Sequence, residues 1–340
     1  MTTLRSLKFT ELQALVAELG WEPYRARQVW RWLWTRGATD IAEMTDLKLD
    51  RRTALAERLT LGAPELRQRQ DDPDGTGKFT FALNDGAVVE SVHIPDGDRR
   101  TICVSSQAGC PLGCRFCATG ALGFRRDLAW HEIAGQVVDV IRLVGARPTN
   151  IVFMGMGEPF LNYDAAIEAV RVINSPDAVA IGARHITLST AGIPDRIRQF
   201  ATLPLQVKLA VSLNAAEPEL RAELMPVSRR HPLPEVIDAV RHYVDVTGRR
   251  VTFEYVLLAG VNDRPTDASA LAALLRGIPC KLNLIPFNAY TGSEFTAPSE
   301  KSLSGFAERL YPHLPAVTIR RSKGPRIAAA CGQLAARPVA

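Results

Sequence analysis

The first seventy residues carry apolar side chains at helical spacing. Four of them recur at intervals of three and four, which places them on one helical face: Leu12, Leu15, Val16 and Leu19. The helix that carries them would begin at a capping box on Thr10. Further helices are expected over residues 24–35 and 51–61. We therefore predict a small helical domain over residues 1–72.

The next segment has the pattern of a β-hairpin. Residues 71–78 (DDPDGTGK) are dense in turn-forming residues and predict a linker. Two runs of β-prone residues, 79–83 and 87–94, then flank the turn sequence NDG at residues 84–86. We expect residues 73–98 to form a hairpin that connects the helical domain to the rest of the chain.

Strands and helices alternate along most of the remaining chain. Apolar, β-prone runs predict strands at residues 101–104, 150–154, 185–189, 207–212, 251–256, 281–285 and 317–320. Helical stretches lie between most of them, at residues 128–144, 163–174, 233–246 and 267–275. Such alternation indicates an α/β fold with a parallel sheet, either open or closed into a complete or partial barrel. We assign it to residues 99–322 and expect the chemistry at the carboxyl ends of the strands.

The C-terminal segment, residues 323–340, is rich in turn formers and basic residues. Gly324, Pro325 and Gly332 predict that this segment is mobile. From residue 318 onward five basic residues and no acidic ones carry a charge equal to the whole chain's +5: Arg320, Arg321, Lys323, Arg326 and Arg337. A polyanion such as RNA suits this charge, and a solvated tail accounts for it equally well.

Three tryptophans at alternate positions, Trp30, Trp32 and Trp34, stand out in the helical domain. On a helix this spacing scatters the rings around the axis, so they cannot all face one partner. We favour core packing for the run over stacking on RNA bases.

Composition narrows the class of protein. The 340 residues are 46% hydrophobic and 23% charged, which is ordinary for a globular protein. The amino terminus lacks an apolar signal sequence, and no window approaches the roughly 20 apolar residues of a membrane span. We therefore expect a cytoplasmic protein with no membrane association. Six cysteines in such a protein indicate metal binding or catalysis rather than disulfides.

Three of the cysteines are closely spaced, in the segment CPLGCRFC: Cys110, Cys114 and Cys117. A structural zinc site normally has four ligands, often as two CxxC pairs, and no second pair exists here. Three cysteines can instead hold a [4Fe–4S] cluster and leave one iron free for another ligand. With Phe116 before the last cysteine, this spacing resembles the radical S-adenosylmethionine (SAM) superfamily. The resemblance implies that SAM binds the free iron and that Phe116 lies against its adenine.

Other segments resemble the SAM-binding parts of that superfamily. Gly157 and Glu158 follow a predicted strand, and the resemblance implies that they bind the amino group of the cofactor. An ionised carboxylate accepts hydrogen bonds from an ammonium, and glycine lets backbone approach a ligand. Small polar residues at further strand ends suit the same pocket, although each alone is more often a turn residue. We assign cofactor binding to Gly157, Glu158, Ser189, Ser212, Leu213, Asn214, Asn288 and Phe116.

Two more cysteines carry a narrower resemblance. Cys103 precedes the triplet and Cys331 lies near the chain end, whereas Cys280, in an apolar strand, is expected to be a buried core residue. The segments TICVSSQAGCPLGCRFCATG, GMGEPFLNY, LIPFN and AACGQL resemble the RlmN and Cfr family of radical SAM RNA methyltransferases. The resemblance covers essentially residues 86–334. A histidine is common in the family at the position of Asn214, which puts substrate detail in doubt.

The family resemblance implies a fold and a reaction. The fold would be a partial (β/α) barrel with a helical, RNA-binding N-terminal domain. The reaction would methylate C2 of an adenosine in 23S rRNA, at the peptidyl transferase centre, and of the adenosine 3′ of the anticodon in tRNA. Cys331 would carry the methyl group as S-methylcysteine, Cys103 would resolve the adduct, and Glu90 would accept a proton. The enzyme would use one [4Fe–4S] cluster per subunit and two SAM molecules per turnover, take electrons from a flavodoxin-like donor, and act as a monomer.

Three alternatives stay open at this point. A Cfr-like enzyme would methylate C8 of the same kind of adenosine with the same cysteine pair, so the motifs do not separate the two. A non-catalytic RNA-binding protein with a structural metal is disfavoured by the open fourth position and by Cys103 and Cys331. A radical enzyme acting on a small molecule is disfavoured by the helical domain and the basic tail.

Overall fold

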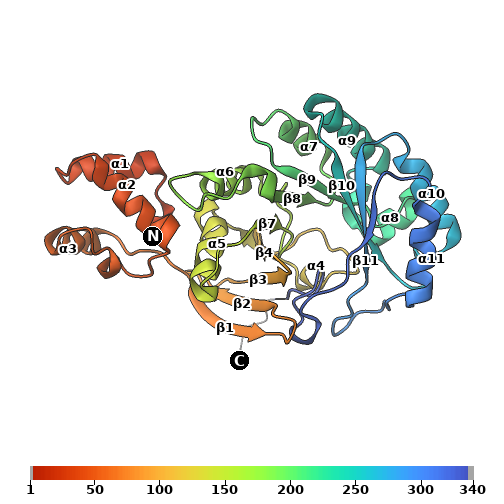
Figure 1. The fold of residues 1–340 in the computed structure, drawn as a ribbon, viewed down its shortest axis with the longest axis horizontal. Coiled ribbons are helices and arrows are strands. Elements are labelled where there is room, and N and C mark those ends of the chain that lie inside the picture. The colour runs from red at the N-terminus through yellow and green to blue at the C-terminus, as the bar shows by residue number, and fades with distance from the viewer. Residues whose placement is uncertain (1–2, 336–340) are drawn as a thin grey trace.

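The N-terminal helices form a separate lobe in the computed structural model, which describes residues 3–335 (Figure 1). They are α1 (Phe9–Glu18), α2 (Tyr24–Arg31) and α3 (Leu49–Arg58), and α2 continues as a π-helical turn over Trp32–Arg36. The predicted start of α1 at Thr10 is wrong. Lys8 is the N-cap, and its backbone N–H donates to the Glu11 carboxylate at 2.6 Å, because Glu11 stands three residues after Lys8.

Within the described residues, ten strands form one sheet in the order β1-β2-β3-β4-β7-β8-β9-β10-β11-β12. The antiparallel part comprises β1 (Glu65–Asp71), β2 (Gly77–Ala82) and β3 (Val88–Asp96), and β3 pairs antiparallel with β4. From β4 onward all neighbours are parallel. The parallel strands are β4 (Arg99–Cys103), β7 (Asn150–Phe153), β8 (Ile186–Thr190), β9 (Lys208–Ser212), β10 (Val251–Leu257), β11 (Cys280–Pro286) and β12 (Val317–Ile319). The predicted α/β class, a partial barrel with helices before it, is confirmed.

The predicted linker at residues 71–78 is the turn of a hairpin. β1 was not predicted, because its sequence ELRQRQD lacks an apolar alternation and its side chains are mostly exposed. The backbone N–H of Asp72 donates to Thr76 at 2.8 Å and that of Gly75 to Asp72 at 2.9 Å, which closes the turn. The strands expected as a connection between domains therefore extend the main sheet.

Helices cover the outer face of the parallel strands (Figure 1). They are α5 (Trp130–Val144), α6 (Tyr163–Asn174), α7 (Pro194–Ala201), α8 (Pro218–Leu224), α9 (Leu233–Thr247), α10 (Pro265–Leu275) and α11 (Glu300–Leu310). A short helix, α4 (Ala118–Leu122), follows the cysteine triplet. None of the helices within residues 3–335 is long and apolar enough to cross a bilayer. Cys280 is buried among core residues, as expected.

The N-terminal lobe is fastened to α5. Trp30 and Trp34 are buried and lie 6.5 and 5.4 Å from Trp130 between ring centroids. Arg5 and Asp139 form a buried ion pair at 2.8 Å, and Asp139 also belongs to α5. Trp30 and Trp34 are thus core residues, as predicted. Trp32 is half-buried and packs against the same core, and its indole N–H donates to Asp46 at 2.5 Å.

Candidate active site

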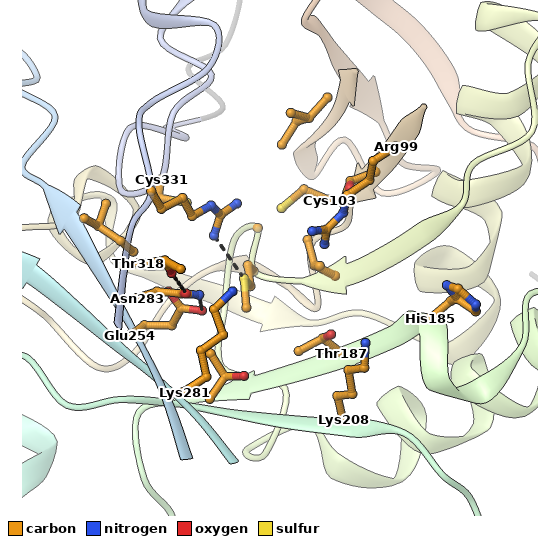
Figure 2. A pocket seen from close by; sticks show the side chains of 18 of the residues that line it. Arg99, Cys103, His185, Thr187, Lys208, Glu254, Lys281, Asn283, Thr318 and Cys331 are labelled. Atoms are coloured by element: carbon orange, nitrogen blue, oxygen red, sulfur yellow. Dashed lines mark hydrogen bonds between the residues drawn. The ribbon is translucent and has the colours of Figure 1, made fainter. Parts of the chain in front are cut away.

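A cavity of about 1520 Å³ lies inside the curve of the parallel strands. Its wall comes from β4, from β7 to β12 and from the C-terminal segment (Figure 2). Cys103, the last residue of β4, lines it together with Cys117 and Cys331. Small-molecule pockets usually have roughly 300–1,000 Å³. This cavity therefore has room for a cofactor and for part of a larger substrate.

The cysteine triplet lies in a loop closed by a two-stranded ribbon. β5 (Gln107–Gly109) and β6 (Phe124–Asp127) pair antiparallel on either side of it. The backbone N–H of Cys110 donates to the carbonyl of Gly123 at 2.8 Å. Gly109 has a φ of +79°, and a Cβ there would lie 2.0 Å from that same carbonyl oxygen. The ribbon therefore closes tightly only with glycine at position 109.

The three thiols lie close enough to influence one another. Burial, and then the charge of Cys117, raises the pKa of Cys114 well above its ordinary value. Burial also raises the pKa of Cys110 to about 12. Without a positively charged centre the thiols of Cys110 and Cys114 stay protonated, whereas a bound metal centre deprotonates coordinating thiols.

The triplet suits a cluster better than a single ion. Within the described residues, no group of three or more His, Cys, Asp or Glu side chains is placed so that it could hold a single metal ion. A zinc ion binds all of its ligands directly, so they must converge on one point. In an iron–sulfur cluster each cysteine binds a different iron, so the sulfurs lie farther apart. The donor set, three thiols in a glycine-closed loop, fits a [4Fe–4S] cluster.

Arg221 is a site residue that sequence reasoning missed. It is fully buried, and its guanidinium donates to the carbonyls of Ala191 at 2.6 Å and Leu213 at 3.0 Å. Burial lowers its pKa to about 10, and the nearby Cys114 opposes that shift. Arg221 ties the ends of β8 and β9 together behind the cluster loop. No local pattern marks it, because its partners are mainly backbone carbonyls, which every residue type has.

Glu158 lies buried beside the cysteine loop. Its carboxylate accepts from the backbone N–H groups of Ala191 at 2.7 Å and Phe160 at 2.9 Å. Burial nevertheless raises its pKa to about 7. A carboxylate that is held in place and short of compensating charge is suited to receive an ammonium group.

The glycines before Glu158 serve a contact within the protein. A Cβ on Gly155 would lie 2.7 Å from the carbonyl oxygen of Val104, and one on Gly157 would lie 2.5 Å from Cβ of Gln107. The segment after β7 thus packs directly on residues 104–107, which lead into the cysteine loop. The expectation that these glycines let the backbone approach a ligand stays a prediction.

Four of the other predicted cofactor-binding residues lie at or just after the ends of β8 and β9, and they differ in burial. Ser189 and Ser212 are half-buried at the ends of β8 and β9. Leu213 and Asn214 are buried, and the Asn214 side chain already accepts from Val256 N–H at 2.8 Å and approaches the Met225 sulfur at 3.2 Å.

Phe116 and Asn288 also have partners within the protein. The ring of Phe116 packs among apolar residues that include Leu258 and Phe287. Asn288 donates to the carbonyl of Cys331 at 3.1 Å and accepts from the Ser322 hydroxyl. The structure thus joins one predicted cofactor ligand to the C-terminal cysteine.

Cys103 and Cys331 face the same cavity, and both are free thiols (Figure 2). Burial, and then the charge of Cys331, raises the pKa of Cys103 to about 12. Arg320 lies beside both, and its pKa is raised chiefly by Cys331. The Arg320 guanidinium also approaches the Met154 sulfur at 3.8 Å. Arg320 is therefore the cation nearest to this cysteine pair that the pKa shifts identify.

The C-terminal segment is packed over the cavity. Backbone N–H groups of Gly324 and Arg326 donate to Asp74 and Asp72 of the β1–β2 turn at 2.9 and 3.0 Å. Ala329, Ala330 and Leu334 are buried. We expected a mobile segment, and the contacts of residues 323–335 differ from that expectation. Arg337, part of the basic tail, lies outside the described residues.

Glu90 lies next to this segment. Its carboxylate accepts from the backbone N–H of Ala335 at 3.0 Å and pairs with Lys78 at 3.3 Å. Glu90 shares a face of β3 with Val92, which pairs with Cys103 on β4. The position of Glu90 is therefore close to the cysteine pair, although its carboxylate has partners already.

Comparison with known proteins adds the family. Residues 104–272 match the Radical SAM superfamily, and residues 2–61 match the Ribosomal RNA large subunit methyltransferase N-terminal domain. Proteins named dual-specificity RNA methyltransferase RlmN, from Anaeromyxobacter dehalogenans and Syntrophobacter fumaroxidans, are each 47% identical over 98% of this chain. The match spans 91% and 98% of those proteins, respectively.

A solved structure agrees with these relatives. The crystal structure of a radical SAM methyltransferase from Sphaerobacter thermophilus is 44% identical and superposes with a TM-score of 0.95. That match covers 99% of this chain and 100% of the other. Similarity of this degree extends over the N-terminal lobe, the barrel and the C-terminal segment together. The chain therefore belongs to the RlmN family of radical SAM RNA methyltransferases.

Proposed function

We propose that this enzyme methylates C2 of an adenosine in 23S rRNA, at the peptidyl transferase centre, and of the adenosine 3′ of the anticodon in tRNA. The observation that carries the proposal is the placement of Cys103 and Cys331 on one cavity next to the cluster loop. Because C2 of adenine is an electron-poor sp² carbon, it cannot displace a methyl group from a sulfonium as an amine does. A route through a methylated thiol avoids that difficulty.

The cofactors would be one [4Fe–4S] cluster on Cys110, Cys114 and Cys117 and two SAM molecules per turnover. Together they supply a transferable methyl group and a hydrogen-abstracting carbon radical. Glu158 would hold the ammonium of SAM, with Gly157, Phe116 and the ends of β8 and β9 around the rest. Leu213 and Asn214 would support the residues that contact SAM, because their own side chains are buried.

The chain's own thiols would carry the methyl group and release the product. The Cys331 thiolate, with Arg320 beside it, would displace the methyl group from the sulfonium and become S-methylcysteine. Transfer of one hydrogen atom from the S-methyl group to the cofactor-derived carbon radical would leave a methylene radical that bonds to C2 of the base, so the RNA stays attached through Cys331. The adduct would regain aromaticity by losing one electron, which would return to the cluster, and the C2 proton, which Glu90 would accept. Cys103 would then attack the Cys331 sulfur, the bond from that sulfur to the methylene carbon would break, and the carbon would take up a proton to become the methyl group. Two electrons from an external donor would reduce the resulting disulfide.

Several parts of the proposal concern the whole enzyme. The N-terminal helical lobe would bind RNA, and an external flavodoxin-like protein would donate electrons. We also propose that the protein acts as a monomer in the cytoplasm. Membership of the family sets aside a non-catalytic role and a small-molecule substrate. Methylation of C8 remains the second candidate, because the same cysteine pair serves that reaction equally well.

One experiment tests the substrate and the position. Ribosomal and transfer RNA from a strain that lacks the gene are digested to nucleosides and analysed by mass spectrometry. We expect 2-methyladenosine to disappear and to return when the wild-type gene is restored. Loss of 8-methyladenosine instead would show that the enzyme methylates C8 rather than C2. An unchanged nucleoside profile in both RNAs would overturn the proposal.

A further inference from the structure

The cavity that holds the cysteine pair has a second end, at the amino ends of the parallel strands. Basic residues line it there, and four of them are Arg99, Lys208, Arg250 and Lys281. Arg99 and Lys208 are the first residues of β4 and β9, Arg250 precedes β10, and Lys281 is the second residue of β11. The parallel register brings these positions to one edge of the barrel. We call these four residues the cationic mouth.

The cationic mouth is a concentration of uncompensated positive charge. Burial lowers the pKa of Lys208, and the charges of Arg99, Arg250 and Lys281 lower it further. Burial also lowers the pKa of Lys281, with Arg250 and Arg99 adding to the effect and Glu254 opposing it. Among the described residues, none of the four forms an ion pair or a side-chain hydrogen bond. Mutual repulsion of this kind opposes folding, which makes an anionic ligand the natural partner.

Figure 2 shows how the charge relates to the cavity. Arg99 enters it from β4, whereas Lys208 and Lys281 enter from β9 and β11. From Lys208 and Lys281 to the carboxyl ends of their strands the chain advances four or five residues, or roughly 13–17 Å at about 3.3 Å per residue. A nucleotide turned out of its RNA helix could thus place its base toward Cys331 while phosphates stay at the mouth.

One side of the wall between the two ends, formed by β10, β11 and β12, carries polar residues. Thr318, Asn283 and Glu254 stand in register on β12, β11 and β10 and form a chain of hydrogen bonds of 2.6 and 2.9 Å. One oxygen of the buried Glu254 carboxylate has no partner within the described residues. A polar wall with a free acceptor can take up the edge of a nucleobase, whereas an apolar wall would penalise it.

From these observations, and resting on the proposed function, we infer that the RNA backbone is gripped by the cationic mouth and that the target base enters the barrel from the amino ends of its strands. The partner is the set of phosphates next to the target nucleotide. These phosphates then lie at the opposite end of the cavity from the cluster loop. SAM and RNA therefore approach the cysteine pair from different sides.

The test removes the charge of two lysines and measures RNA binding. An anticodon stem–loop RNA is titrated with the cluster-loaded wild type and with K208Q/K281Q at several salt concentrations. For single-stranded phosphates the slope of log K against log salt is about −0.7 per neutralised phosphate, so two lost contacts reduce its magnitude by roughly 1.4. We expect that reduction and at least a tenfold weaker affinity. The matched control K301Q/R241Q removes two exposed cations outside the cavity and should bind like the wild type.

A charge-preserving variant and an RNA-free reaction complete the design. K208R/K281R should recover the affinity that K208Q/K281Q loses, because phosphates bind either cation. Methylation of Cys331 by SAM alone reports whether the barrel is intact. Equal affinities and slopes for K208Q/K281Q and K301Q/R241Q would overturn the inference, as would an arginine variant as weak as the glutamine variant. A wild type that neither binds nor methylates RNA would instead overturn the proposed function.

Discussion

At the scale of single residues, burial raises the pKa values of two groups of this site. Glu158 is buried next to the cysteine loop, Cys103 is buried beside Cys331, and both have raised pKa values. In each case the shift comes mainly from loss of water around the charged form. Such groups hold or transfer charge when a ligand arrives, and they cost stability when none is present.

The pH dependence of stability follows from Glu158. Its folded-state pKa of about 7 lies above the ordinary 4.5, so its stabilising contribution is complete below pH 4.5 and is lost as pH rises through about 7. We expect cofactor-free E158Q to lose roughly 1–3 kcal/mol less stability than the wild type between pH 5 and pH 8. Urea denaturation at both pH values measures the difference. The control E219Q changes an exposed carboxylate and should lose as much stability between the two pH values as the wild type. An equal loss in E158Q would contradict the assignment of the pH dependence to Glu158.

Replacing each cysteine of the pair should block the reaction at a different step. Without Cys331 there is no methyl carrier, so Cys331→Ala should yield neither S-methylcysteine nor methylated RNA. Without Cys103 the methyl transfer and the bond to the base still form, but the adduct cannot be released. Cys103→Ala should therefore accumulate protein linked to RNA through Cys331, visible on a denaturing gel and by mass spectrometry of the C-terminal peptide. Normal turnover by either variant would mean that these thiols are structural, and Cys280→Ala serves as the control.

At the scale of elements, one hairpin turn positions the C-terminal segment. The β1–β2 turn supplies Asp72 and Asp74, which accept from the backbone of Arg326 and Gly324. β3 supplies Glu90, which accepts from Ala335. An extension of the sheet that looked like a connection between domains therefore holds the segment that carries Cys331.

Removing the carboxylates of Asp72 and Asp74 should free the C-terminal segment without unfolding the barrel. In D72A/D74A the amides of Gly324 and Arg326 lose charge-assisted hydrogen bonds worth about 1.5–3 kcal/mol each. We expect hydrogen exchange across residues 323–335 to become at least tenfold faster, with little change in the global unfolding midpoint. The control D98A alters an exposed turn carboxylate in the neighbouring hairpin. Unchanged exchange in D72A/D74A would show that apolar packing alone holds the segment.

At the scale of the whole molecule, the N-terminal lobe and the barrel share a buried contact. Arg5 donates to Asp139 and to the carbonyl of Ala38, and Trp30 and Trp34 pack on Trp130. Deleting residues 1–72 would uncover this surface and remove β1. We therefore expect such a deletion to impair SAM cleavage as well as RNA binding, rather than RNA binding alone.

A sharper test of that contact changes the ion pair. Arg5→Leu leaves Asp139 charged and buried without its partner, which typically costs about 3–5 kcal/mol. The double variant R5L/D139L removes both charges and should recover most of that loss. Chemical denaturation of the three proteins measures the free energies of unfolding. A single variant as stable as the wild type would mean that water reaches Asp139 and that the lobe is loosely attached.

Local sequence determined the fold class and the chemistry of the cysteine loop. Strand and helix periods, the CxxxCxxC spacing and the GMGEP segment are properties of short windows, so they can be interpreted before the chain folds. For the same reason, predictions from short windows were wrong for features that depend on residues distant in the sequence. β1 has no apolar alternation, because most of its side chains stay exposed at the edge of the sheet, and residues 71–78 look like a linker until β1 is known.

Only the tertiary structure decided which distant residues meet. Arg221 is recognisable as a site residue because it bonds the backbone ends of two strands, and backbone acceptors leave no trace in sequence. Asp72 and Asp74 reach the C-terminal segment across most of the chain length. Arg99, Lys208 and Lys281 are far apart in sequence, and they form one charged mouth only because parallel strands place their amino ends side by side. A sequence records what each strand carries, and the order and register of the strands decide what stands next to it.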